Sequence, residues 1–531
     1  MDIIQSRVST QTEEYKQNFT HYETLIDELH TYRKQASIGG SEKARTLHRK
    51  RNQLMPRERI AAVLDPGSPW LEIGQLAGLK LHKGVPPGAL MVTGIGLVRN
   101  RPCMFICNDP TVKGGTLYGM TCNKQMRAQE IAEQYHLPTI TMVQSGGAFL
   151  PDIAGIFPDK RIMTNIIRQS AKGIPQIASV HGPSTAGGAY IPALCDENII
   201  VKNQGAMFLG GPQLTFAATG EQVDVETLGG AEMHCSVSGV ADHLAENDLH
   251  AMALIRSAVS NLPSPKPLRW DVEEPREPLY DPKEIYGLIN RDPKFPTDNR
   301  EILARLVDGS EIHEFKKLYG DTLITAMARI KGYKVGILIN NGVLYTESSN
   351  KATHFIDMCS KWDIPLLFIA DINGFMVGTD VERQGIAKAG ANMINAMANA
   401  KVPRITLIIG GSYGAGYLAM CGRPFDPELL LMWPTARCAL MGTEQAVTTL
   451  TQVQEGIHER EGSSWTDEEK SAFQAPIRKT FDDFANAYNW AANQWCDAII
   501  DPLETRDTIA MALELSGRKP TEETTFGIFR M

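Results

Sequence analysis

The sequence predicts an α/β protein made of two related units in tandem. A stretch with the pattern of a buried strand, a glycine turn and a helix occurs twice, at Ile174–Cys195 and at Val402–Cys421. Strand and helix patterns alternate on both sides of a segment rich in proline and charge, Asn261–Pro282, which favours α/β layers over a β-sandwich. The two halves align at nearly constant offsets, with the pairs Asn108/Asn340 (232), Pro138/Pro365 (227), Pro175/Pro403 (228), Ala186/Ala415 (229) and Gly210/Gly442 (232). Such steady offsets indicate a tandem duplication.

Four segments are expected along the chain: a helical leader at 1–55, a first domain at 56–262, a linker at 263–283 and a second domain at 284–531. Apolar residues at helical spacing predict an amphipathic helix over about Thr10–Lys34 in the leader. The other predicted elements are strands at Cys103–Asn108 and Thr139–Gln144, helices at about Cys122–Tyr135 and before Gly173, an acidic helix at Ser464–Ala475 that stops before Pro476-Ile477-Arg478, and a last helix containing Tyr488, Trp490 and Trp495.

Composition excludes several classes of function. The chain has 531 residues and a net charge of -8, which argues against a nucleic-acid-binding face. Its nine cysteines include no CxxC pair, and its histidines show no metal-ligand spacing, so no metal site is expected. The N-terminal residues lack the apolar core of a signal peptide, and the uncharged stretch Ile174–Cys195 contains three prolines. We therefore expect a cytoplasmic protein with no membrane segment.

The two glycine turns are the candidate chemical sites. The first backbone N–H groups of a helix have no intrahelical partner, so each turn can stabilise a negatively charged oxygen. Gly410–Gly414 also fits the G-x-S-x-G pattern of serine hydrolases around Ser412, but the single later histidine, His458, lies in a charged segment. The sequence has no phosphate-binding loop and no HExxH motif. A pair of donor sites without an evident general base suits an enzyme whose substrate or cofactor supplies the base.

Several motifs in order resemble the carboxyltransferase (β) subunits of biotin-dependent acyl-CoA carboxylases, in the branch of the 3-methylcrotonyl-CoA and geranyl-CoA carboxylases. The matching motifs are NDPTVKGG at Asn108–Gly115, QSGGA at Gln144–Ala148, STAGGAY at Ser184–Tyr190, AATGE at Ala217–Glu221, LGGA at Leu228–Ala231 and NGFMVG at Asn373–Gly378. The resemblance implies two crotonase-like domains, each a ββα superhelix, and a β hexamer whose active sites form between subunits. Biotin would arrive on a biotinylated α subunit, since this sequence has neither a Met-Lys-Met attachment site nor an ATP-grasp loop.

The resemblance also implies roles for individual residues. The N–H groups of Ala186 and Gly187 would hold the thioester oxygen of the acyl-CoA as it becomes an enolate, and those of Ala415 and Gly416 would hold the ureido oxygen of biotin. Carboxybiotin would supply CO₂, and the biotin nitrogen would then act as the base. The implied acyl-CoA contacts are Gly146, Gly147, Ala148, Phe149, Gly188 and Lys113, and the implied biotin contacts are Gly374, Phe375, Gly414 and Tyr417.

The substrate is expected to be 3-methylcrotonyl-CoA or a similar branched 2-enoyl-CoA, carboxylated at the γ carbon. Three departures from the methylcrotonyl pattern keep geranyl-CoA and propionyl or longer acyl esters as alternatives: Phe149 stands where Asn is usual, the segment Lys160–Met163 is short, and Gly378–Arg383 resembles other branches. A decarboxylase subunit running the reaction in reverse, a non-catalytic assembly subunit and the serine hydrolase are the rival functions.

Overall fold

The computed structural model describes residues 2–293, 295–520 and 526–528, and its N-terminal part contains one mixed sheet. The strands of this sheet are buried apolar runs, as expected for strands covered on both faces. Their spatial order is β2-β3-β4-β5-β6-β7-β9, with β8 beside the end of β6. Their bounds are β2 Trp70–Ile73, β3 Met91–Val98, β4 Arg101–Asn108, β5 Thr139–Ser145, β6 Gln176–Thr185, β7 Glu197–Val201, β8 Ala206–Phe208 and β9 His243–Ala245.

The second sheet repeats this topology strand for strand. Its order is β10-β11-β12-β13-β14-β15-β17, with β16 beside the end of β14, and the same pairs are antiparallel or parallel in both sheets. The leader adds one short strand, β1, at the edge beside β10. The bounds are β1 Asp2–Ile3, β10 Glu311–Glu314, β11 Leu323–Ile330, β12 Tyr333–Asn340, β13 Leu366–Ile372, β14 Arg404–Tyr413, β15 Leu429–Met432, β16 Arg437–Ala439 and β17 Ala498–Ile499. The predicted duplication and the predicted α/β class are confirmed.

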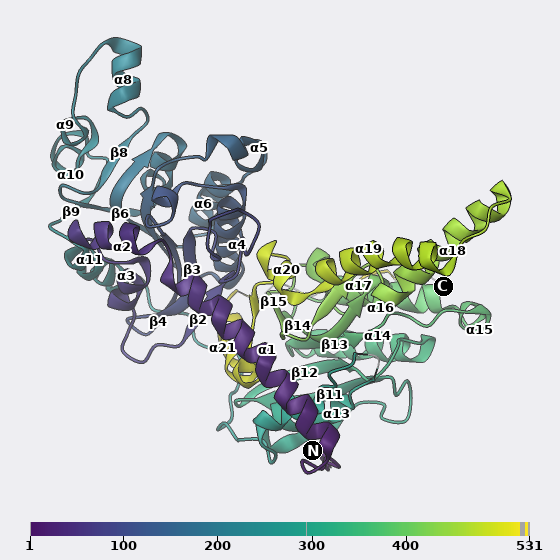
Figure 1. Ribbon diagram of the computed structural model, residues 1–531. Coiled ribbons are helices and arrows are strands. Elements are labelled where there is room, and N and C mark those ends of the chain that lie inside the picture. The colour runs from purple at the N-terminus through teal and green to yellow at the C-terminus, as the bar shows by residue number, and fades with distance from the viewer. Residues whose placement is uncertain (1, 294, 521–525, 529–531) are drawn as a thin grey trace.

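Helices cover both sheets and connect their parallel strands (Figure 1). In the leader and the first unit they are α1 Glu13–Ile38, α2 Glu42–Lys50, α3 Pro56–Val63, α4 Gly119–Tyr135, α5 Ile153–Ile156, α6 Ile162–Ala171, α7 Tyr190–Ala193, α8 Pro212–Thr219, α9 Val225–Gly229, α10 Ala231–Met233 and α11 Asp248–Ser260. In the second unit they are α12 Ile285–Leu288, α13 Asn299–Leu306, α14 Thr346–Lys361, α15 Thr379–Arg383, α16 Ile386–Asn399, α17 Gly414–Ala419, α18 Thr443–Glu461, α19 Asp467–Ala485, α20 Ala487–Ala492 and α21 Thr505–Arg518.

The two units pack against each other through one continuous core. Ile131 of α4 belongs to the same apolar cluster as Leu429 of β15 and Leu513 of α21. Beside this cluster, Arg127 of α4 forms two hydrogen bonds with the buried Asp497, at 2.7 and 3.0 Å. Because apolar and ionic contacts both cross the boundary, the two turns are held in a defined relative position.

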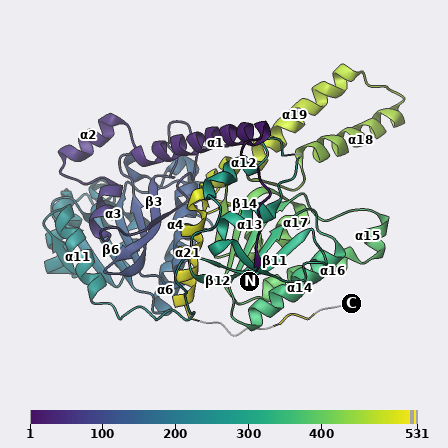
Figure 2. The same cartoon turned by 90° about the horizontal axis from the view of Figure 1, so that it is seen from below.

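The long helix α1 of the leader lies along both units (Figure 2). On the second unit its Tyr22 ring stacks on Tyr286, with centroids 4.9 Å apart. Just after its C-terminal end, the Gly40 N–H donates to Thr111 Oγ1 of the first unit at 2.9 Å. The predicted leader helix is therefore present, four residues longer at its C-terminal end than expected.

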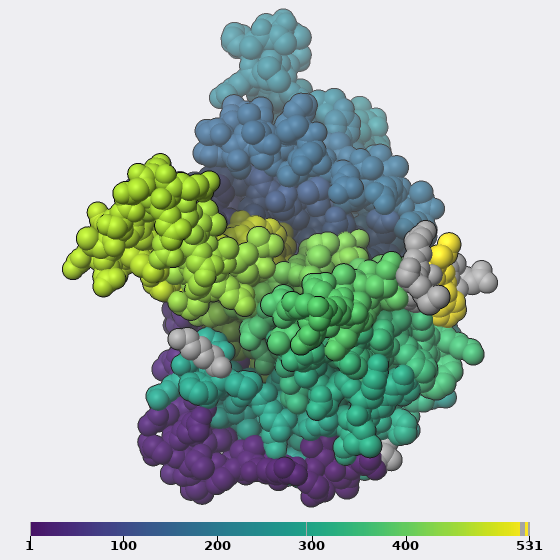
Figure 3. Space-filling view, turned by 90° about the vertical axis from the view of Figure 1, so that its right-hand side faces the viewer, coloured from purple at the N-terminus to yellow at the C-terminus, as the bar shows by residue number. Residues whose placement is uncertain are grey.

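Each unit carries one projection near its turn, α8 on the first and the α18–α19 hairpin on the second (Figures 1 and 3). The predicted helix end at Pro476 is wrong, because α19 continues through this proline to Ala485. Contacts with α18 on either side of the proline compensate for the lost backbone hydrogen bond. Gln474 donates to Thr451 Oγ1, and Arg478 pairs with Glu444.

Candidate active site

The first glycine turn leaves the sheet at the end of β6. Ala186, the residue after the strand, has φ of 52°, an uncommon value for a residue with a side chain, and residues 186–189 then form one 3-10 turn. Gly187 is exposed, and a Cβ on it would lie 3.3 Å from Cε of Met163. Ser184 Oγ donates to the Gly188 carbonyl at 2.9 Å and fixes the turn from below. The N–H groups at this turn are therefore presented at an accessible surface.

The second turn has the same geometry, one residue out of step with the sequence alignment. β14 ends at Tyr413, and Gly414 follows it with φ of 53°. Gly414 is thus the structural equivalent of Ala186, and Ala415 is the equivalent of Gly187. The alignment of Ala186 with Ala415 is wrong by one position, because strand ends and backbone angles define the equivalence rather than the shared alanine.

A second backbone segment lies beside each turn, and the sequence alone did not identify it as a source of donors. Leu117 N–H donates to the Gly147 carbonyl, and Phe149 N–H donates to the Leu117 carbonyl. This pattern directs the Ala148 N–H to the opposite side of the segment, where β6 and its turn lie. A Cβ on Gly147, whose φ is 90°, would lie 3.3 Å from Thr185 Oγ1, so the loop and the turn are in close contact.

The second unit repeats this arrangement around Phe375. Leu344 N–H donates to the Gly374 carbonyl, and Met376 N–H donates to the Leu344 carbonyl, so the Phe375 N–H faces the second turn. A Cβ on Gly416 would lie 3.2 Å from Gly374 Cα. Leu117 and Leu344 are 227 residues apart, and so are Ala148 and Phe375. This repeat offset therefore pairs Ala148 with Phe375 as equivalent donors.

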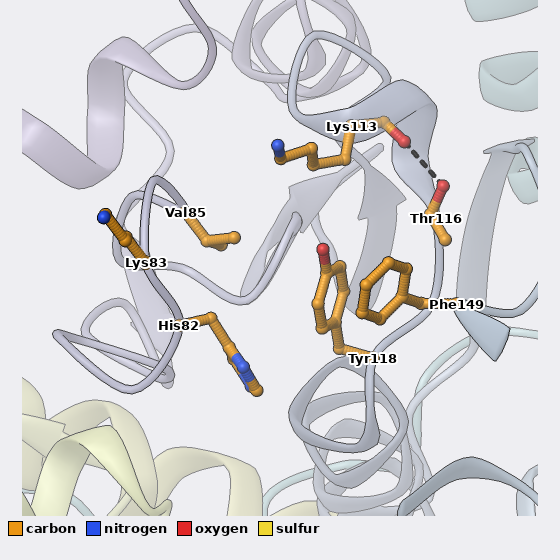
Figure 4. Close-up of a pocket in the computed structure, with 7 residues that line it drawn as sticks. All are labelled: His82, Lys83, Val85, Lys113, Thr116, Tyr118 and Phe149. Carbon is orange, nitrogen blue, oxygen red and sulfur yellow. Dashed lines mark hydrogen bonds between the residues drawn. The ribbon is translucent and has the colours of Figure 1, made fainter. Parts of the chain in front are cut away.

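A cavity of about 470 Å³ lies beside the loop of the first unit (Figure 4). Phe149 stacks on Tyr118 with ring centroids 4.5 Å apart, and Lys113 lies across the cavity from His82 and Lys83. The structure therefore brings Lys113 and Phe149 to one cavity next to the loop of Gly146, Gly147 and Ala148. Its lysines give it a positive lining suited to an anionic ligand.

The second unit has open space beside its loop, which a side chain on Gly374 would occupy. Gly374 has φ of 126° and nothing within 4 Å of the place of a Cβ, and it lies against Gly416. Backbone N–H groups of this kind can donate to a ligand oxygen on which negative charge develops. Tyr417 has a structural position instead: its hydroxyl accepts the Arg423 N–H at 2.7 Å and its ring packs on Trp490.

The residues needed for a serine hydrolase are not brought together. Ser412 is 1% exposed, and its strand neighbour is Cys438. His458 lies sixteen residues into the projecting helix α18, about 22 Å along it from Thr443. Its Nδ1 is hydrogen-bonded to Ser463 Oγ at 2.6 Å. His458 therefore cannot act as the base for Ser412.

No described helix is long and apolar enough to cross a membrane. Among the described residues, no three His, Cys, Asp or Glu side chains cluster so as to hold a metal ion.

Comparison with known proteins agrees with this geometry. The model of the carboxyl transferase domain family matches residues 47–527. The chain is 49% identical to the biotin-dependent 3-methylcrotonyl-coenzyme A carboxylase beta1 subunit of Mycobacterium tuberculosis, over 96% of this chain and 97% of that protein. It is 47% identical to the mitochondrial methylcrotonoyl-CoA carboxylase beta chain of Arabidopsis thaliana, over 100% of this chain and 92% of that one.

Among solved structures, the β subunit of geranyl-CoA carboxylase from P. aeruginosa superposes with a TM-score of 0.89 at 38% identity, covering 99% of both chains. The two units thus have the expected crotonase-like fold. Family model, full-length relatives and fold agree, and the chain belongs to the carboxyl transferase domain family as a carboxyltransferase subunit of the biotin-dependent acyl-CoA carboxylases.

Proposed function

We propose that this protein transfers a carboxyl group from biotin to the γ carbon of 3-methylcrotonyl-CoA. The observation that carries the choice of substrate is the similarity along the whole chain to methylcrotonyl-CoA carboxylase subunits, at 49% and 47% identity. In the structure, a Cβ on Gly187 would lie 3.3 Å from Met163 Cε, so Met163 borders the turn that would hold the acyl group.

The backbone of the first unit would stabilise the enolate. The N–H groups of Ala148 and Gly187 belong to a loop and a turn in close contact, and they would donate to the thioester oxygen as negative charge develops there. Ala186, with its left-handed backbone, starts the turn, and the Gly188 carbonyl is held by Ser184. Lys113 and Lys83 would attract the phosphates of coenzyme A along the cavity beside Phe149.

The backbone of the second unit would bind biotin. Biotin, when bound, supplies the carboxyl group and the base, which explains why the turns need no acid or base of their own. The N–H groups of Phe375, Ala415 and Gly416 would donate to the ureido oxygen, and the open space beside Gly374 would leave room for the rings. Gly414, with φ of 53°, starts the turn. Tyr417 would support this turn from within the core.

A complete site would need a second copy of the chain. Exposed apolar side chains surround both turns: Leu150, Ile153 and Phe157 on the first unit, and Met376, Val377 and Leu440 on the second. Exposed apolar groups that cluster in this way are typical of interfaces. We propose that the first unit of one subunit faces the second unit of another within a β hexamer, and that a biotinylated α subunit brings biotin to the junction.

Transfer of labelled carboxyl from a carboxylated biotin carrier to acetyl-, propionyl-, 3-methylcrotonyl- and geranyl-CoA tests the proposal. We expect 3-methylcrotonyl-CoA to have the highest kcat/KM. Preference for geranyl-CoA would favour the second candidate substrate, which the similarity to the geranyl-CoA carboxylase subunit supports. No transfer to any ester, with a carrier that is active towards another carboxyltransferase, would contradict the proposed function.

A further inference from the structure

Five buried residues beneath the first turn form a closed ring of hydrogen bonds, which we call the buried ring. Arg59 donates through Nη2 to Gln144 Oε1 (2.8 Å) and through Nε to Asp248 Oδ2 (3.0 Å). Gln144 Nε2 donates to Gln53 Oε1 (3.2 Å), and Gln53 Nε2 donates to the His181 carbonyl (3.0 Å). His181 Nδ1 closes the ring on Asp248 Oδ1 (2.7 Å). The ring joins the leader, α3, β5, β6 and α11.

His181 and Asp248 of the ring, together with Ser179 beside it, have the hydrogen bonds of a catalytic triad, but solvent and ligands cannot reach them. Ser179 Oγ lies 2.8 Å from His181 Nε2, and both residues have no exposed surface. Burial and the nearby Arg59 lower the pKa of His181 to about 4, so the imidazole is neutral near neutral pH. A neutral His181 donates from Nδ1 to Asp248 and accepts from Ser179 at Nε2. No substrate can reach this serine, so the triad has no nucleophilic function.

The ring instead touches both backbone segments that present the candidate donors. Gln144 immediately precedes the loop Ser145–Ala148, and its own N–H is held by Asn108 Oδ1 at 3.2 Å. His181 lies on β6, five residues before Ala186. Gly182, next to His181, packs directly on Gln144, because a Cβ there would lie 2.6 Å from Gln144 Cγ. One glutamine side chain thus connects the loop and the turn.

We propose that the buried ring, through Gln144, is the positioning device that holds the Ala148 and Gly187 N–H groups at the separation needed for the acyl-CoA oxyanion. This inference rests on the proposed function and assigns Gln144, Gln53 and Arg59 as positioning residues. Each residue of the ring is hydrogen-bonded to two others, and among the described residues Arg59 Nη1 alone has no partner in it. These links restrict the ring to one geometry, and loss of one link leaves further buried polar groups unpaired. Displacements of about 1 Å in a donor site are enough to reduce a rate by one to two orders of magnitude.

The test compares Gln144→Leu with Gln176→Leu in the full-length protein. Gln176 is an equally buried glutamine at the opposite end of β6, and its Nε2 donates to the Ile166 carbonyl at 2.8 Å. Three quantities are measured: kcat for transfer to 3-methylcrotonyl-CoA, KM for the carboxylated carrier, and release of CO₂ from that carrier without acyl-CoA. Gln53→Leu, which opens the ring at another link, is the second variant if Gln144→Leu does not fold.

We expect Gln144→Leu and Gln53→Leu to lower kcat for transfer about tenfold or more. The KM for the carrier and the CO₂ release, which depend on the second unit, should stay within about twofold. Gln176→Leu should lower the melting temperature comparably but leave kcat within about twofold. The inference would be overturned if the Gln144, Gln53 and Gln176 variants had equal kcat for transfer. It would also be overturned if Gln144→Leu and Gln53→Leu reduced transfer and CO₂ release to the same extent. A wild-type protein that transfers to no ester would instead contradict the proposed function.

Discussion

The two units present the same turn but support it differently from below. At the position of Gln144 the second unit has Asp371, and at the position of Gly182 it has Gly410, whose Cβ would collide with the Asp371 carboxylate. Asp371 accepts from the Gly411 N–H at 3.1 Å and from Asn299 Nδ2 at 3.2 Å. Burial raises the pKa of Asp371.

This difference shows which part of the repeat is constrained. The first unit fixes its turn through a ring of five residues around Arg59, whereas in the second unit one carboxylate accepts a hydrogen bond directly from an N–H of the turn strand. In both units a glycine on the turn strand makes room for a polar side chain that ends the neighbouring strand. The backbone geometry is common to both units, and the side chains beneath it are not.

The largest effect should come from valine at each turn, where the two units respond differently. Gly416→Val would place a Cβ 3.2 Å from Gly374 Cα, so the backbone of the loop around Gly374 must move, and transfer and CO₂ release should both fall more than about 100-fold. In Gly187→Val the Cβ meets the flexible end of Met163, so the change stays at the acyl side. Transfer should fall similarly while CO₂ release persists.

Gly456→Val is the control for both turn variants, because a Cβ at Gly456 meets nothing within 4 Å. It should keep full activity. If Gly187→Val removed CO₂ release as completely as Gly416→Val, the assignment of one substrate to each unit would be wrong.

A smaller effect is expected at the ionic contact that joins the units. Burial alone would raise the pKa of Asp497, but Arg127 and Arg423 outweigh it and lower this pKa to about 2. Asp497→Asn should therefore lower the free energy of unfolding by about 3 kcal/mol near neutral pH. Urea unfolding of both proteins measures the difference.

The pH dependence of this difference has a definite sign. A carboxyl with a lowered pKa stabilises the fold fully above its unfolded pKa, about 4, and loses that contribution as the pH falls towards 2. The gap between wild type and Asp497→Asn should shrink over that interval. Asp483→Asn, at an exposed pair with Lys479, should cost at most about 0.5 kcal/mol at any pH. A gap that stays constant down to about pH 2 would contradict the assignment to Asp497.

The smallest effect should follow from Ser412→Ala. This serine occupies the same place at the end of its strand as Ser184, and His458 cannot act as its base, so transfer should change less than about twofold. His458→Ala, on the projecting hairpin, should behave alike. A loss of more than about 100-fold in both variants would restore the hydrolase interpretation.

Much of the fold was predictable because its signals are local. Strands such as Thr139–Ser145 are short apolar runs rich in β-branched residues, and each turn needs small residues over a few consecutive positions. The duplication was predicted from residues that recur at similar offsets in the two halves, such as Pro138/Pro365 and Pro175/Pro403. Pro476 wrongly predicted the end of a helix. The proline removes one backbone hydrogen bond from α19, but the packing of α19 on α18 compensates for that loss.

By itself the sequence determined the α/β class, the duplication, the family and the two candidate turns, since all of these depend on short patterns or their recurrence. Tertiary structure alone decided the one-residue shift between the turns, the orientation of the Ala148 and Phe375 N–H groups, and the ring that unites Gln53, Arg59, Gln144, His181 and Asp248. The physical reason is that buried polar groups must find partners, and those partners come from distant parts of the chain that only folding brings together.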